Sequence, residues 1–472
     1  MSRKLIIYTA TVLLLFVLII TIESVQANNT VYVSSSMGND SNDGTKDSPY
    51  KTLNYALKSH ADTILIKAGD IFYESISING KVVDRYGKGE NPILYGVKIP
   101  RRGAWENGVI RDNKWIKRES NIWRLNLSLD DEYYSGYKTG GSSFLNNAGF
   151  IVNLITNDMN NCRKVPNYVN LKYNFDFWQP CPVDNPKNSI PKDFDFLYLY
   201  FEGNPNDYDF GISLGATAVS IKNGEVRNLN IRYWGFGIIF YDNVKISNCE
   251  IDGIGGFIQR GSHWVLLGNG VESWITPPKR KNCLIENCNI SRTFDSGATI
   301  QGRHSERNIR AEDILFRNNK FRNCCQSFEE FLRGPGDEDL YYNCVFENNI
   351  SIDAGIDTGF RYYDNRYKRC HFLSNSNLRN TNLIIRNNTT TNGNYYCAGA
   401  YQQYYRQAQW QGNVCHIKRG QDLLGNYLGT KDIITVPISK GSFNNIEEAT
   451  NSAISRYRQL TGDFTTQFNI IE

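Results

Sequence analysis

The chain has 472 residues, of which 40% are hydrophobic, 13% aromatic and 21% charged. Lys and Arg number 52 against 48 Asp and Glu, a net charge of +4, and so small an excess excludes a protein built mainly to bind nucleic acid. The apolar content excludes a disordered chain. Turn-forming residues are abundant, with 55 Asn and 39 Gly, which favours many short strands over a helical bundle.

Residues 1–27 have the three-part form of a secretory signal. Arg3 and Lys4 precede an apolar run over residues 5–22, and a small-residue cleavage site ends at Ala27. The alternative is an uncleaved membrane anchor, because a run of 18 residues nearly reaches the length that spans a bilayer. We expect cleavage and export to the medium, the periplasm or the cell surface, with no membrane span in the mature chain.

Export makes the 11 cysteines relevant, because disulfides persist outside the cytosol. Cys162 and Cys181 bracket a proline-containing, loop-like stretch, so we predict a disulfide between them. Six cysteines lie in strand-like repeats and are predicted to be small buried hydrophobes: Cys249, Cys283, Cys288, Cys324, Cys325 and Cys344. The sequence lacks paired C-x-x-C motifs, which argues against a zinc site.

Residues 28–99 are predicted to form an N-terminal cap and a first coil. SPYKTLNYALKSH places Leu53, Ala56 and Leu57 on one face of a short helix. The segment DTILIKAGDIFYESISI then favours strands. From residue 100 to 214 the regular pattern is lost, and aromatic residues, prolines and loops dominate. This stretch is predicted to be a β-rich insertion or side domain.

Residues 215–425 contain a repeat. Five segments share an alternating apolar strand, an asparagine and a second short strand, and their asparagines are 39, 31, 30 and 39 residues apart: Asn248, Asn287, Asn318, Asn348 and Asn387. Short strands at this spacing predict a parallel β-helix. At a bend, each asparagine can adopt left-handed geometry and bond the equivalent amide one coil away, giving a ladder. The alternative is an antiparallel sandwich, but the repeats lack its two-residue hairpins.

The last segment, residues 426–472, is predicted to close the array. SFNNIEEATNSAISRYRQLTGD predicts an amphipathic helix, with these residues near one face: Ile446, Ala449, Ala453, Ile454 and Tyr457. A solenoid needs closing segments, because its first and last coils are otherwise exposed.

The stretch VYVSSSMGNDSNDGTKDSPYKTLNYAL, followed by DTILIKAGDIFYESI, resembles the N-terminal cap of secreted right-handed parallel β-helix proteins of the pectin-lyase-like superfamily. NIWRLNL, LYLYFEGNPNDYDFGISL, and GNGVESW followed by NCLIENCNISRTFDSGATIQ resemble the same group. The likeness touches most of the chain from Val31 to about Tyr401.

This resemblance implies an all-β, right-handed parallel β-helix with an N-terminal cap helix, and a polysaccharide as the partner. It specifies no activity, because the architecture hosts lyases, hydrolases, epimerases and non-catalytic adhesins. No Asp-x-x-Asp cluster matches the calcium-dependent pectate lyases. We therefore predict no cofactor, and calcium has no motif in its support.

Four carboxylates of the repeat region are the candidate catalytic residues: Glu272 in GNGVESW, Asp295 in RTFDSG, and Glu329 and Glu330 in SFEEF. Equivalent positions of neighbouring coils form columns, so distant carboxylates can meet on one face. Glycoside hydrolysis uses two carboxyl groups about 5–5.5 Å apart for retention or roughly 6.5–9.5 Å for inversion. Adjacent strand residues point to opposite faces, so only one of the last two can face a substrate. The structural alternative is that these carboxylates bond turn amides.

A lyase would use other residues. β-Elimination from a uronic acid needs a base for the proton beside the carboxylate and a cation to neutralise that carboxylate. The predicted substrate-binding residues have these types, together with an aromatic ring for sugar stacking: Arg303, His304, Arg333, Arg361, Tyr362 and Trp274.

The sequence therefore predicts an exported protein that binds a polysaccharide and cleaves it, with hydrolysis by paired carboxylates as the first hypothesis. Elimination from a uronic-acid glycan is the second. A non-catalytic carbohydrate-binding or adhesive surface protein is the third. No nucleic-acid partner is expected, and the sugar, the linkage and the oligomeric state stay open.

Overall fold

The computed structural model describes residues 29–98, 115–127, 148–153, 163–180, 193, 195–213, 216–259, 265–274, 279–302, 310–332, 341–356, 370–374, 382–399, 408–426 and 434–471. The signal segment and the predicted Cys162–Cys181 bridge lie outside these residues.

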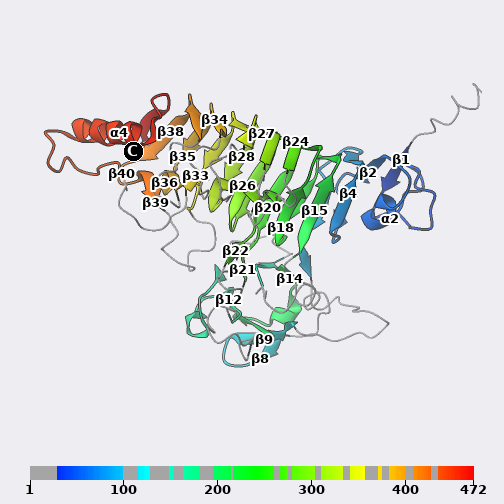
Figure 1. Ribbon diagram of the computed structural model, residues 1–472. Coiled ribbons are helices and arrows are strands. Elements are labelled where there is room, and N and C mark those ends of the chain that lie inside the picture. The colour runs from blue at the N-terminus through cyan, green and yellow to red at the C-terminus, as the bar shows by residue number, and fades with distance from the viewer. Residues whose placement is uncertain are drawn as a thin grey trace, which may run out of the picture.

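Three long sheets run side by side along one axis (Figure 1). Sheet A contains, in spatial order, β1 (Thr30–Val33), β2 (Thr63–Lys67), β5 (Val82–Tyr86), β16 (Gly224–Arg227), β19 (Val244–Ser247), β24 (Lys279–Glu286), β27 (Arg310–Arg317), β31 (Val345–Glu347), β34 (Ile384–Arg386) and β37 (Gln409–Gln411), with β30 (Tyr341–Tyr342) also on β27. Sheet B contains β3 (Ile71–Phe72), β6 (Ile93–Tyr95), β17 (Asn230–Arg232), β20 (Glu250–Ile254), β25 (Asn289–Thr293), β28 (Lys320–Arg322), β32 (Ile350–Ile352), β35 (Thr389–Thr391), β38 (Val414–Lys418) and β41 (Gln467–Ile471). Sheet C contains β4 (Ile76–Asn79), β15 (Thr217–Lys222), β18 (Phe236–Phe240), β23 (Val271–Trp274), β26 (Ser296–Gly302), β29 (Gln326–Leu332), β33 (Cys370–Ser374), β36 (Tyr395–Gly399), β39 (Asp422–Asn426) and β40 (Ile434–Thr435).

The chain visits sheets A, B and C in turn and returns to A one strand further along. Neighbouring strands in these sheets run parallel, apart from the antiparallel pair β39–β40 at one end. The architecture is therefore a parallel β-helix, with the right-handed crossovers that parallel strands almost always have. The parallel β-helix predicted from the repeat and from the resemblance is confirmed.

Apolar side chains at equivalent positions of successive coils fill the interior. Val271, Ala298, Phe328 and Phe372 lie opposite one another in sheet C and belong to one continuous buried cluster. The nine cysteines in the described residues are all buried, and six of them are those predicted to be small core residues; Cys249 and Cys288 carry free thiols in this structure. Buried cysteine side chains pack as small hydrophobes.

The corner from sheet A to sheet B is the most regular part of each coil. Each of the five predicted asparagines, from Asn248 to Asn387, has a φ between 54° and 56°, which confirms their left-handed geometry. Two further columns at the other bends share this geometry, as Asn243 (55°) and Asn392 (53°) show. Asparagine tolerates this region better than most residues, so part of the Asn excess serves the corners.

The predicted asparagine ladder belongs to the next residue, which corrects the sequence interpretation. Asn348 is exposed, whereas Asn349 is buried. The buried amides bond in series, each Nδ2 donating to the Oδ1 one coil on: Asn319 to Asn349 (3.1 Å), Asn349 to Asn388 (3.1 Å) and Asn388 to Asn413 (3.0 Å). The left-handed residue turns the chain, and the side chain after it points inward.

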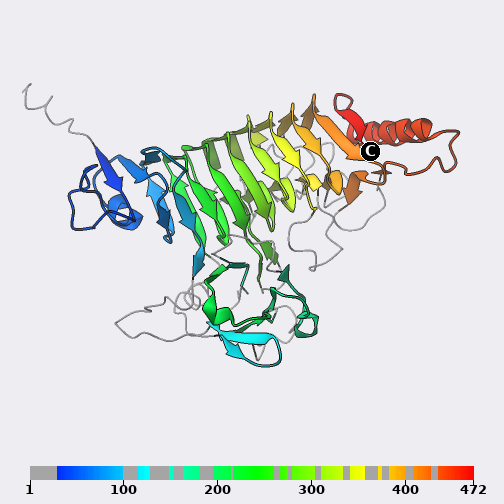
Figure 2. The same ribbon diagram turned by 180° about the vertical axis from the view of Figure 1, so that it is seen from behind.

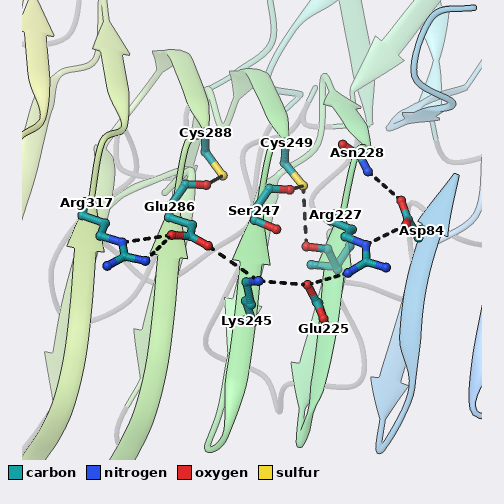
Figure 3. A network of polar contacts seen from close by, with 11 residues as sticks. Asp84, Glu225, Arg227, Asn228, Lys245, Ser247, Cys249, Glu286, Cys288 and Arg317 are labelled. Carbon is teal, nitrogen blue, oxygen red and sulfur yellow. Dashed lines mark hydrogen bonds and ion pairs between the residues drawn. The ribbon is translucent and has the colours of Figure 1, made fainter.

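Side chains of opposite charge alternate on the outer face of sheet A. In adjacent strands Arg227, Ser247, Glu286, Arg317, Glu347 and Arg386 lie opposite one another. Arg227 pairs with Asp84 at 2.6 Å, and Arg317 pairs with Glu286 at 2.7 Å, while Lys245 joins Glu225 and Glu286 around the neutral Ser247 (Figure 3). Each exposed pair contributes only about 0–1 kcal/mol. Opposite charges in adjacent strands also disfavour a register slip.

Two small sheets protrude from the solenoid below β20 (Figures 1 and 2). The first contains β7 (Val97–Lys98), β14 (Phe210–Ser213) and β10 (Ile151–Asn153). The second contains β11 (Arg163–Lys164), β12 (Asp176–Trp178), β13 (Phe196–Tyr200), β9 (Ile122–Asn126) and β8 (Ile116–Lys117). Two 3₁₀ helices, η3 (Tyr168–Asn170) and η5 (Pro205–Asp207), lie in the same part of the chain. The buried Lys164 Nζ donates to Ala148 O (2.7 Å) and to Gly256 O (2.8 Å), and so ties these sheets to the corner between sheets B and C.

Short helices lie at both ends of the solenoid. Helix α2 (Leu53–Leu57) buries Leu53 and Ala56. The predicted C-terminal helix is confirmed as α4 (Ile446–Thr461), which is capped by the Asn445 side chain and ended by Gly462 at φ 72°. No helix in the described part of the chain has the length and apolar character needed to cross a membrane. A further hairpin, β21 (Phe257–Gln259) with β22 (Val265–Leu267), precedes β23.

Candidate functional site on sheet C

Three polar residues form a column on the outer face of sheet C. Glu272 lies opposite Thr299, and Thr299 lies opposite Glu329. Their strand neighbours Val271, Ala298 and Phe328 point into the core, so the alternation along a strand directs the polar residues outward. We call Glu272, Thr299 and Glu329 the carboxylate column.

A chain of hydrogen bonds connects three of the predicted carboxylates. Asn269 Nδ2 donates to Glu272 Oε2 (2.7 Å), and the Ser296 backbone N–H donates to Asn269 Oδ1 (2.9 Å). The Ser296 hydroxyl donates to Glu329 Oε2 (2.7 Å). From the next strand, Gln326 Nε2 reaches both Ser296 Oγ (3.1 Å) and Asp295 Oδ1 (2.7 Å). The structure thus brings Glu272, Asp295 and Glu329 into one network.

Burial makes the two glutamates of the column chemically unusual. Glu272 is 7% exposed and Glu329 is 5% exposed, although both lie on the outer face of the sheet. Burial raises the pKa of Glu272 above its ordinary value, the negative charge of Glu329 raises it further, and the bond from Asn269 opposes the shift. A carboxyl group in such surroundings keeps its proton to higher pH, as a general acid must.

Thr299 lies between the two glutamates. It is fully buried, and its hydroxyl finds no hydrogen-bond partner among the described residues. A buried hydroxyl left without a partner costs free energy, so this atom is a candidate ligand or water contact. Strand spacing places the α-carbons of Glu272 and Glu329 about 9.6 Å apart, two strands of about 4.8 Å each.

Glu330 points the other way, into the interior. It lies opposite Ile300 of the core, and the Ser374 hydroxyl donates to its Oε1 at 2.5 Å. Burial, with the Glu330 charge adding to it, raises the pKa of the nearby Tyr341. Glu329 is therefore the member of the adjacent pair that faces outward.

The structure does not describe the side chains of the six predicted substrate-binding residues. Trp274 is the last residue of β23, where its backbone lies opposite Gln301, and its side chain is outside the description. Five other candidates lie outside the described residues: Arg303, His304, Arg333, Arg361 and Tyr362. In sequence, they belong to connections that directly precede or follow strands of sheet C.

Long connections concentrate at sheet C. From β19 to β20 and from β31 to β32 the chain passes from sheet A to sheet B in two residues. By contrast, the two protruding sheets and the β21–β22 hairpin all enter between a strand of sheet B and a strand of sheet C. Functional residues favour such loops on a rigid scaffold, which agrees with the position of the carboxylate column.

Sequence reasoning missed the residues that join the carboxylates. Asn269, Ser296 and Gln326 occupy equivalent positions in β23, β26 and β29 or immediately before them. Aligning NGVES, SGATI and QSFEE would have placed these residues in one column and Thr299 between the glutamates. An alignment on the corner asparagines does not give this register. The connections between each corner asparagine and the following strand of sheet C differ in length from coil to coil.

No group of three or more His, Cys, Asp or Glu side chains in the described residues could hold a metal ion. The potential metal ligands of the site are the oxygen atoms of two glutamates, one threonine and one asparagine. Three of these oxygen atoms already accept hydrogen bonds, Glu272 Oε2 from Asn269 and both Glu329 Oε2 and Asn269 Oδ1 from Ser296.

The fold and this site define a parallel β-helix protein with buried paired carboxylates on one face. No protein-family model matches the chain, and no curated protein matches it in sequence. Solved structures similar to it include XylC in complex with xylose, at 12% identity over 84% of this chain and 69% of that chain, with a TM-score of 0.46. An alginate lyase from Paenibacillus sp. str. FPU-7 has 11% identity over 84% and 90%, with a TM-score of 0.36. A lacto-N-biosidase from Eubacterium ramulus has 12% identity over 86% and 67%, with a TM-score of 0.34.

Proposed function

We propose that this protein binds a polysaccharide along the outer face of sheet C and hydrolyses its glycosidic bonds, with Glu272 as general acid and Glu329 as general base. One observation carries the proposal: a buried carboxyl group with a raised pKa shares a column with a second carboxylate, whose charge contributes to that shift. A carboxyl group whose pKa is raised by burial and by a neighbouring carboxylate is the usual candidate for a general acid.

The spacing favours inversion of configuration. The α-carbon separation of about 9.6 Å suits carboxyl groups roughly 6.5–9.5 Å apart, which leaves room for a water molecule. Glu272 gives its proton to the leaving oxygen as the glycosidic bond breaks. Glu329 takes a proton from the water whose oxygen bonds to the anomeric carbon. Asp295 acts through Gln326 and Ser296, so its role is to position Glu329.

A polysaccharide is the substrate class that these features support. The column runs along the solenoid axis, so an extended polymer can lie across several coils. The N-terminal sequence favours export, and we propose that the mature protein acts outside the cytosol. The resemblance in sequence to pectin-lyase-like proteins points to the same class.

The test is a product assay on a broad panel of neutral and acidic glycans. Hydrolysis yields new reducing ends without ultraviolet absorbance, and proton NMR of the first product gives its anomeric configuration. Unsaturated, ultraviolet-absorbing products would replace the proposal with β-elimination. Binding without cleavage across the panel would replace it with a carbohydrate-binding role.

Variants connect that activity to the column. Glu272→Gln and Glu329→Gln should each lower kcat by about 10²–10⁴-fold, the usual contribution of general acid or base catalysis. Glu250→Gln is the matched control, because this glutamate lies on sheet B with its side chain 42% exposed. Full activity in Glu272→Gln would remove Glu272 from the mechanism.

A further inference from the structure

Two cysteines lie next to each other in consecutive coils. Ser247 is opposite Glu286, and Glu250 is opposite Asn289, so Cys249 and Cys288, which lie between these pairs, share a register position. The Asn289 N–H donates to Cys249 O at 2.9 Å and fixes this alignment. Both side chains are buried, at 2% and 1% exposure.

The two thiols begin the column that becomes the asparagine ladder. Cys288 N–H donates to Asn319 Oδ1 at 2.9 Å, as the Asn319 N–H does to Asn349 Oδ1. In later coils, amide side chains at this position join one coil to the next. Cys249 and Cys288 make weaker thiol contacts, Cys249 to Ser247 O at 3.4 Å and Cys288 to Glu286 O at 3.3 Å (Figure 3). The neighbouring Cys249 side chain and burial both raise the pKa of the Cys288 thiol.

We propose that Cys249 and Cys288 form a disulfide that links two consecutive coils at the start of the asparagine ladder. Neighbouring strands are about 4.8 Å apart, and disulfides join α-carbons roughly 4.4–6.8 Å apart. Two other described cysteines lie opposite residues of other types: Cys283 lies opposite Val244 and Ile314, and Cys397 lies opposite Phe372 and Leu424.

The chemistry is thiol–disulfide exchange with an external disulfide such as oxidised glutathione or an exported oxidoreductase. One thiolate attacks the oxidant and expels a thiolate, and the second cysteine then displaces the other half. Two protons and two electrons leave the pair, the S–S bond forms, and the oxidant is reduced to two thiols. Since the finished coil buries both sulfurs, the exchange takes place before these coils are fully packed. Outside the cytosol the bond then persists.

Peptide mapping tests the bond directly. The exported protein is unfolded without reductant, its free thiols are blocked with N-ethylmaleimide, and it is cut by trypsin and a glutamate-specific protease. Cleavage after Lys245, Glu250, Glu286 and Arg292 separates Cys288 from Cys283. We expect residues 246–250 linked to residues 287–292, and the link lost on reduction. Complete maleimide labelling of both cysteines, also after refolding with oxidised glutathione, would overturn the proposal.

Thermal unfolding gives an independent measurement. Reduction should lower the Tm of the wild-type protein by at least about 2 °C, and Cys249→Ala should abolish that sensitivity. Cys283→Ala is the matched control, a buried cysteine in the same coil as Cys288, and should keep it. An equal response to reductant in wild type and Cys249→Ala would contradict the crosslink. Neither measurement depends on the proposed hydrolysis.

Discussion

Glu272 combines stability and chemistry in one side chain. Its burial, with Glu329 nearby, raises its pKa, so the folded state holds the proton more tightly than the unfolded chain does. By linkage, the stability contributed by protonated Glu272 is fully present below its ordinary pKa of 4.5 and is lost as pH rises through the folded value. The raised pKa that the proposed general acid requires is thus maintained at the expense of folding at neutral pH.

We therefore expect Glu272→Gln to be stabilised relative to wild type, and increasingly so as pH rises above 4.5, because glutamine cannot ionise. Thermal unfolding of both proteins in steps from acid to neutral pH measures the difference. Glu250→Gln, at a glutamate on sheet B with its side chain 42% exposed, is the control. A Tm difference that is constant with pH would contradict the raised pKa.

Thr299 offers a sharper test of the column. Thr299→Val keeps the shape and removes a hydroxyl without a partner among the described residues, so stability should be unchanged or slightly higher. If the hydroxyl contacts water or substrate in the transition state, kcat should fall on the order of 10²-fold, and Thr299→Ser should restore most of it. Thr390→Val, at a buried position on sheet B, is the control. Unchanged kcat in Thr299→Val would exclude the contact.

At the scale of a strand and its corner, the sequence was informative about the backbone and less so about side chains. The left-handed asparagines were predictable, because few other residues tolerate that geometry. The ladder was misplaced by one residue, because Asn318 and Asn319 are adjacent and look alike in sequence. Only burial distinguishes them, since the Asn318 side chain is exposed and the Asn319 side chain is buried.

A ladder asparagine should contribute more to the free energy of unfolding than the corner asparagine beside it. Asn349 accepts from the Asn319 N–H (2.9 Å) and donates to Phe316 O (3.1 Å). Asn349→Ala leaves these buried groups unsatisfied, at about 1–3 kcal/mol for each. Asn348→Gly keeps the positive φ without strain, so a change under about 0.5 kcal/mol is expected. Urea unfolding compares the two; equal losses would show that the ladder does not stabilise the coil.

For the whole molecule, the repeat predicted the solenoid, because short strands with regular corners leave few other ways to bury apolar faces. The protruding sheets were not predictable in detail, since their strands do not repeat and pair across long sequence separations, as β9 does with β13. The site was predictable in part. Four carboxylates stood out by sequence, but their register was needed to separate Glu329 from Glu330 and to add Thr299.

The last coil needs α4 to cover it. Tyr457 is fully buried, its ring lies 6.0 Å from that of Tyr396 and 5.0 Å from that of Phe468, and its hydroxyl donates to Asp463. Tyr457→Ala should cost about 3–5 kcal/mol and expose the sheet end, which promotes association. Tm and size-exclusion chromatography measure both effects. Phe464→Ala is the control, since that ring is 70% exposed. A monomeric variant with unchanged Tm would contradict this role.

The two-residue passage from sheet A to sheet B, which recurs in every coil from β16 onward, has a consequence for how such a chain can evolve. Because that corner fixes where each coil restarts, a whole coil of about 30 residues, such as 318–347, can be duplicated or deleted without shifting the phase of its neighbours. The connections on both sides of sheet C can meanwhile lengthen independently, coil by coil. The molecule can therefore change the length of the face that carries the carboxylate column and the connections around that face through separate genetic events.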